Sequence, residues 1–98
     1  MFSNNLFEGK IALVTGGGSG IGYAISQRLL ELGSTVYIAS RNEEKLQKAV
    51  EKLRSFGPCQ YQVCDIRQPD QIRALAAFIQ ANSGRLDFLY NNAGGQFP

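Results

Sequence analysis

Apolar residues along the chain fall into two patterns that alternate from one end to the other. Short runs rich in β-branched and aromatic residues predict strands at 11–14, 35–39, 60–64 and 87–90. Between these runs, apolar residues spaced three or four positions apart predict helices at 21–32, through 46–53 and at 70–81. The apolar stripe of the first helix is expected to comprise Ile21, Ala24, Ile25, Leu29 and Leu32.

Four strands separated by three helices indicate a parallel sheet, because a helical crossover is the usual way to join parallel neighbours. Right-handed crossovers then predict the strand order 3-2-1-4 in an α/β fold of the doubly wound type. This order creates a topological switch point between the first and fourth strands. Ligands of such sheets bind there, at the carboxyl ends of the strands.

A glycine-rich segment at 15–22, reading TGGGSGIG, joins the first strand to the first helix. Glycines let the backbone turn sharply and approach a pyrophosphate, and the N–H groups at the start of the helix favour the anion. The spacing is T-G-x-x-x-G-x-G, through Thr15, Gly16, Gly20 and Gly22, and not G-x-G-x-x-G. A plain turn is the alternative, which so many glycines disfavour because each is costly to order.

The composition is typical of one globular domain, with 98 residues, 44% hydrophobic and 18% charged, and a net charge of +2. The charges form no basic run that would suit a nucleic acid. The absence of histidine excludes Ser-His and Cys-His nucleophile pairs. Cys59 and Cys64 lie five residues apart in what reads as one extended strand that includes the range 60–64, so they are about 16 Å apart, which is too far for a disulfide and favours a reducing compartment. No signal segment or membrane span is expected, and the expected location is cytoplasmic.

A second motif follows the fourth strand, where the chain reads NNAG at 91–94. Together with the glycine loop, this segment resembles the short-chain dehydrogenase/reductase family over essentially the whole chain. The resemblance implies a bound dinucleotide cofactor, with the adenine near the residues after the third strand and the ribose near the NNAG segment. The cofactor-binding residues that it implies there are Gly16, Ser19, Gly20, Ile21, Gly22, Asp65, Ile66, Asn92, Ala93 and Gly94. A turn or strand-end role is the alternative for the residues at the strand ends.

The end of the second strand indicates which dinucleotide is bound. Proteins that bind NAD place an acid there, on the ribose 2′-hydroxyl, whereas this chain reads Ala39-Ser40-Arg41-Asn42. The planar guanidinium of Arg41 suits a 2′-phosphate and predicts NADP(H) as the cofactor, although a solvated surface arginine is the alternative. Glu43 and Glu44 are expected to serve the dipole of the following helix. The basic residue that the family often carries within the glycine loop is replaced by Ser19, whose hydroxyl is able to donate a hydrogen bond to a phosphate.

The family's chemistry is hydride transfer, with a Tyr as acid/base, a Lys beside it, and an orienting Ser and Asn. No Y-x-x-x-K pattern occurs in this sequence, so we assign no catalytic residue. The resemblance therefore implies that residues 1–98 are the N-terminal half of a doubly wound Rossmann fold, an NADP-binding half-domain. Family members are usually homo-oligomers, through helices that have no counterpart here.

The segments at 29–41 and 91–97 are similar to the peroxisomal trans-2-enoyl-CoA and 2,4-dienoyl-CoA reductase branch of the family. This similarity implies a fatty enoyl-CoA as substrate, with Gln96 and Phe97 near the nicotinamide. A bland loop is the alternative for these two residues. Two other functions remain open: a stand-alone dinucleotide-binding or regulatory module without catalysis, and a methyltransferase. Methyltransferases generally carry an acid at the end of the second strand, so Arg41 argues against the latter.

Overall fold

A computed structural model describes residues 6–16, 18, 20–65 and 67–91, and it contains every strand and helix that the sequence predicts. The predicted ends lie within two residues of the observed ends, except that the second helix begins at Glu43, three residues before the predicted range. Along the chain the elements are β1 Ile11–Thr15, α1 Gly20–Glu31, β2 Thr35–Ser40, α2 Glu43–Leu53, β3 Cys59–Val63, α3 Pro69–Ser83 and β4 Phe88–Asn91.

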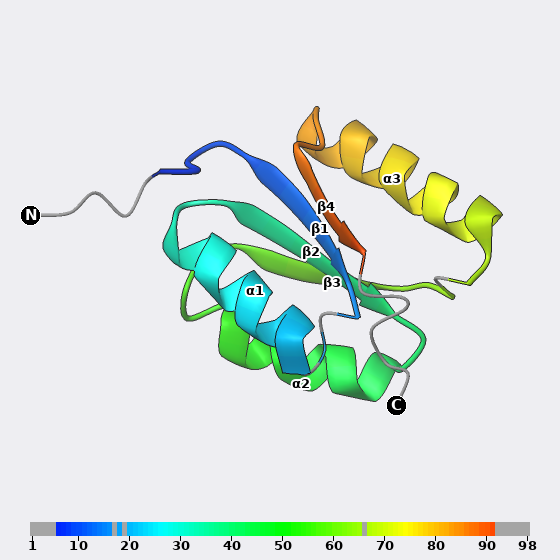
Figure 1. Cartoon of the computed structure of the whole chain (residues 1–98), viewed down its shortest axis with the longest axis horizontal. Coiled ribbons are helices and arrows are strands. Elements are labelled where there is room, and N and C mark those ends of the chain that lie inside the picture. Colours follow the sequence, from blue (N-terminus) through cyan, green and yellow to red (C-terminus); the bar gives the residue numbers. More distant parts are fainter. Residues whose placement is uncertain (1–5, 17, 19, 66, 92–98) are drawn as a thin grey trace, which may run out of the picture.

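The four strands form one parallel sheet in the order β3-β2-β1-β4, which confirms the predicted topology. Thr15 at the end of β1 pairs with Ala39 of β2 on one side and with Asn91 of β4 on the other. The carboxyl ends of the strands therefore share one edge of the sheet (Figure 1). The glycine loop begins at this edge, directly after Thr15.

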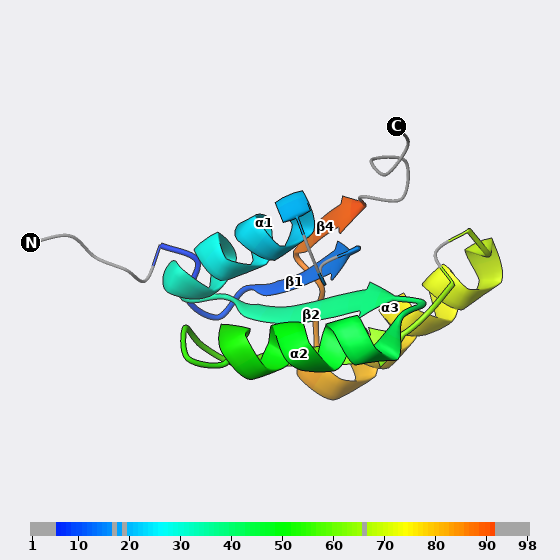
Figure 2. The same ribbon diagram turned by 90° about the horizontal axis from the view of Figure 1, so that it is seen from below.

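Helices cover both faces of the sheet: α1 and α2 lie on one face, and α3 lies on the other (Figures 1 and 2). The alternation of side chains along a strand explains how both layers are built. In β1 and β2, the even-numbered residues pack under α1 and α2, and the odd-numbered residues face α3. This arrangement explains why β1 is apolar throughout, since both of its faces are buried.

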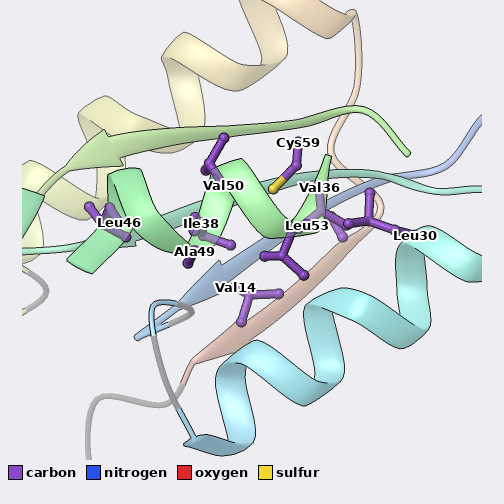
Figure 3. Packing of buried hydrophobic residues seen from close by; sticks show 10 residues of the cluster. Val14, Leu30, Val36, Ile38, Leu46, Ala49, Val50, Leu53 and Cys59 are labelled. Carbon is purple, nitrogen blue, oxygen red and sulfur yellow. The ribbon is translucent and has the colours of Figure 1, made fainter. Parts of the chain in front are cut away.

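Helix α2 supplies much of the larger core through one apolar stripe. Its buried residues are Leu46, Ala49, Val50 and Leu53, as the helical spacing predicts. Figure 3 shows these side chains pointing toward the strand residues of the same cluster. The helix starts at Asn42, whose side chain accepts a hydrogen bond from the backbone N–H of Lys45 at 3.1 Å.

The buried face of α1 differs from the predicted stripe. Ile21 and Ala24 are exposed, and the most buried line runs through Gly22, Ser26 and Leu30. The small residues let the start of the helix lie close to the sheet, and the hydroxyl of Ser26 donates to the carbonyl of Gly22 at 2.8 Å, which satisfies it without water. Periodicity missed this face because it counts apolar residues, whereas close packing here depends on small ones.

Both cysteines are buried free thiols, but they lie on different faces of the sheet. Cys59 begins β3 and belongs to the core under α1 and α2, whereas Cys64 follows the last residue of β3 and packs on the α3 side. The expectation that one strand contains both cysteines was therefore wrong by a single residue, because β3 ends at Val63, directly before Cys64.

Candidate functional site

The glycine loop leaves β1 through a sharp turn that an ordinary residue would resist. The backbone N–H of Gly16 donates to the carbonyl of Ala39 in β2 at 2.7 Å, and Gly16 has φ = 72°. Gly20, the first residue of α1, has φ = 60°, and a Cβ added there would meet nothing within 4 Å. Because L-residues avoid this region, the loop geometry depends on glycine at both positions. Their predicted role against a pyrophosphate stays a prediction.

The three glycines Gly16, Gly20 and Gly22 have different structural roles. Gly16 makes the turn, Gly20 starts the helix with its surroundings open, and Gly22 is buried where α1 approaches the sheet. Ile21 lies between the last two in the chain, with 64% of its surface exposed. Ile21 is one of the predicted cofactor-binding residues, and it is an exposed apolar residue in the first turn of α1.

Arg41 follows the last residue of β2, at the edge that the glycine loop shares. It is exposed, and none of the ion pairs in the described part of the chain uses it. No acid stands next to it in the turn, where the hydroxyl oxygen of Ser40 accepts from the backbone N–H of Asn42 at 3.2 Å. Glu43 and Glu44 lie in the first turn of α2, as expected, and Glu43 accepts a hydrogen bond from the Tyr61 hydroxyl at 3.0 Å.

Asp65 lies two residues after the end of β3 and is held by Arg67. Its Oδ1 accepts from the Arg67 Nε at 3.1 Å and from the Arg67 backbone N–H at 3.0 Å, and its Oδ2 accepts from Nη2 at 3.3 Å. These hydrogen bonds from Arg67 are the main reason that the pKa of Asp65 lies below its ordinary value, and Arg41 adds a smaller effect of the same sign. The carboxylate thus stays ionised and fixed in direction, beside the predicted phosphate ligand.

The switch point between β1 and β4 is tied together by Thr15 and Asn91. The fully buried Thr15 hydroxyl lies 2.9 Å from the Asn91 Oδ1, to which it donates. This bond fixes the end of β4 against the start of the glycine loop. The sequence placed both residues at the crevice but gave no sign of a bond between them, because they are 76 positions apart.

Several predicted cofactor residues lie outside the described residues: Ser19, Ile66, Asn92, Ala93 and Gly94. The structure therefore brings together Gly16, Gly20, Ile21, Gly22, Arg41 and Asp65 along one edge. Within the described ranges, no group of three or more His, Cys, Asp or Glu side chains is placed to hold a metal ion. None of the helices that the structure describes has the length and apolar character required to cross a membrane.

Comparisons with known proteins give consistent results. A family model described as short chain dehydrogenase matches residues 10–98. The peroxisomal 2,4-dienoyl-CoA reductase [(3E)-enoyl-CoA-producing] of Danio rerio is 41% identical over 99 residues, which cover 99% of this chain and 33% of that protein. The chain spans about a third of the length of the curated relatives that it matches.

Solved structures share the fold and differ in their cofactor. The Pseudomonas aeruginosa RhlG/NADP active-site complex is 41% identical with a TM-score of 0.85, over 96% of this chain and 38% of that one. An NAD+-bound xylitol dehydrogenase is 33% identical with a TM-score of 0.85, over 94% of this chain and 39% of that one. The shared architecture is therefore compatible with either dinucleotide, and the choice between them depends on individual side chains.

Proposed function

Because this chain belongs to the short chain dehydrogenase family, we propose that residues 1–98 form the NADP(H)-binding Rossmann unit of an oxidoreductase. The observation that carries this proposal is Arg41, an exposed guanidinium at the end of β2 where NAD-binding sheets place an acid. A 2′-phosphate offers a planar cation two oxygen acceptors, so Arg41 suits NADP(H) better than NAD(H).

The remaining predicted residues complete the proposed site. The glycine loop, with Gly16, Gly20 and the start of α1, holds the pyrophosphate by its backbone N–H groups and the helix dipole. The fixed carboxylate of Asp65 accepts from the adenine amino group. Ser19 and Ile66, together with Asn92, Ala93 and Gly94, keep the roles that the sequence resemblance implies.

For the substrate we propose a fatty enoyl-CoA, which the similarity to a 2,4-dienoyl-CoA reductase supports. We assign no catalytic residue within 1–98. Following NADPH absorbance with a trans-2-enoyl-CoA, in the oxidoreductase that carries this unit, tests the substrate. Cofactor binding without turnover would instead favour the stand-alone binding module. Family membership sets aside the methyltransferase alternative, and the cytoplasmic location stays a prediction.

Titration calorimetry with NADPH and NADH tests the cofactor preference. A lost charge-assisted hydrogen bond costs about 1.5–3 kcal/mol, so Arg41→Ala should weaken NADPH about ten- to a hundredfold and leave NADH nearly unchanged. Arg73→Ala is the matched control, because Arg73 is an exposed arginine of α3. This helix covers the face of the sheet opposite to α1 and α2 (Figure 1). Equal weakening of both cofactors by Arg41→Ala, or tighter binding of NADH by the unaltered chain, contradicts the proposal.

A further inference from the structure

A groove of about 320 Å³ runs between α1 and α2 and opens beside the glycine loop. It is lined by Gly18 of the loop, Tyr23 of α1, and Lys45, Lys48, Ala49 and Lys52 of α2. The three lysines lie along one side of α2 at a spacing of three to four residues, and no acidic residue is among the described residues that line the groove. The three ammonium groups therefore give the α2 side of the groove a positive charge.

Lys45 occupies the end of the groove that touches the loop. A Cβ built on Gly18 would lie 3.5 Å from the Cβ of Lys45, so this lysine starts directly beside the loop backbone. Its own backbone is fixed, because its N–H donates to the capping Asn42. Arg41, one turn earlier in the chain, precedes the same cap, so both cations flank the start of α2.

The charge of Lys45 is not committed elsewhere in the described part of the chain. None of the ion pairs found there includes Lys45, and the neighbouring Glu43 is engaged by the Tyr61 hydroxyl. Gly18 carries no side chain, so nothing of its own stands between Lys45 and a ligand on the loop. An anion that bound between Arg41 and the loop would thus meet the Lys45 ammonium group in addition to the Arg41 guanidinium, and no ion pair described above would have to break.

We propose that Lys45 is a specificity-determining residue that supplies the second cation for the NADPH 2′-phosphate. The proposal rests on the proposed function, in which Arg41 supplies the first cation. Many members of the family carry the second positive charge within the glycine loop, whereas this chain has the neutral Ser19 there. Lys45 provides the charge from the neighbouring helix, across the position of Gly18.

The test is binding of two matched ligand pairs, NADPH with NADH and 2′,5′-ADP with 5′-AMP, by titration calorimetry. Lys45→Gln removes the charge and keeps helix propensity, because lysine and glutamine are similar in that respect. It should weaken NADPH and 2′,5′-ADP about two- to fivefold, as expected of one partly exposed ion pair, and leave NADH and 5′-AMP unchanged. Lys45→Arg should keep the preference for the phosphorylated ligands.

Lys52→Gln is the matched control, because it removes the same charge from the same groove about two turns further along α2. It should leave all four affinities nearly unchanged. A loss for Lys52→Gln equal to that for Lys45→Gln overturns the proposal, since the effect would then be general electrostatic attraction. Equal weakening of NADPH and NADH by Lys45→Gln also overturns it, because a merely structural role of the lysine gives that result.

The outcomes separate this proposal from the proposed function. If Arg41→Ala removes the preference for NADPH but Lys45→Gln leaves it intact, the proposed function stands and the role of Lys45 is wrong. If the unaltered chain binds NADPH no better than NADH, both proposals are wrong. Circular dichroism of each variant, compared with the unaltered chain, confirms that the differences do not come from a loss of fold.

Discussion

Replacing Gly20 by alanine tests whether backbone conformation shapes the proposed pyrophosphate site. Gly20 has φ = 60°, a region that costs an L-residue about 1–2 kcal/mol. An added Cβ meets nothing within 4 Å, so no steric term is added. Alanine also restricts the unfolded chain, which returns about 0.4–1 kcal/mol. The net loss expected for Gly20→Ala is therefore about 1 kcal/mol of unfolding free energy, or about 4–8 °C in Tm for a domain of this size.

Gly84 offers a matched control at the other end of the fold. It ends α3 with φ = 81°, and an added Cβ there also meets nothing within 4 Å. Gly84→Ala should therefore lose a similar free energy of unfolding, measured by urea denaturation of both variants. Only Gly20→Ala should also weaken NADPH, by about three- to tenfold, since one displaced backbone donor costs about 0.5–1.5 kcal/mol.

Two results would refute this reasoning. A gain in stability for Gly20→Ala, with a loss for Gly84→Ala, would mean that the first helical residue does not adopt a left-handed conformation. An equal loss of NADPH affinity in both variants would mean that overall stability, and not the shape of the loop, controls binding.

Two further predictions concern stability and thiol chemistry. Asp87 accepts from the Arg85 side chain and from the Ile11 N–H, and these bonds hold its pKa below the ordinary 3.8. Because the folded pKa is the lower one, the contribution of Asp87 to stability is present above about pH 4 and is lost as the pH falls through the folded pKa. Urea denaturation should therefore show Asp87→Asn less stable than the unaltered chain at pH 7, with the difference shrinking below pH 4; a constant difference would contradict this. Burial raises the pKa of the Cys59 thiol to about 12 and also raises that of Cys64, and the two residues are 2% and 4% exposed. A thiol reagent at pH 8 should therefore label both cysteines only as fast as the chain unfolds, and immediate labelling without denaturant would show that they are accessible.

The order of strands and helices could be predicted because two periods dominate this sequence. The continuous apolar run of β1 indicates a strand that is buried on both faces. The 3.6-residue spacing in α2 indicates a helix that is buried along one stripe. The burial of α1 could not be predicted in this way. Its buried line of Gly22 and Ser26 is set by how closely the helix approaches the sheet, a property of the assembled fold and not of apolar spacing.

Some parts of the proposed site could likewise be predicted from the sequence, and others could not. Gly16, Gly20 and Arg41 could be located from the sequence because each lies within two residues of the end of a predicted element. The contact between Gly18 and Lys45 could not, since these residues are 27 positions apart and belong to different βα units. The position of a helix start relative to a neighbouring loop depends on the twist and packing of the whole sheet, which no local pattern encodes.

Arg67 shows how a residue outside the predicted site can decide what the site is able to bind. Arg41 and Asp65 follow the adjacent strands β2 and β3, and their charges are close enough for Arg41 to lower the pKa of Asp65. An acid in that position could take Arg41 as its partner and leave no cation for a phosphate. In the structure, both oxygens of Asp65 accept from the Arg67 side chain instead, at 3.1 and 3.3 Å. None of the ion pairs in the described part of the chain therefore includes Arg41, and the proposed preference for NADPH depends on this guanidinium.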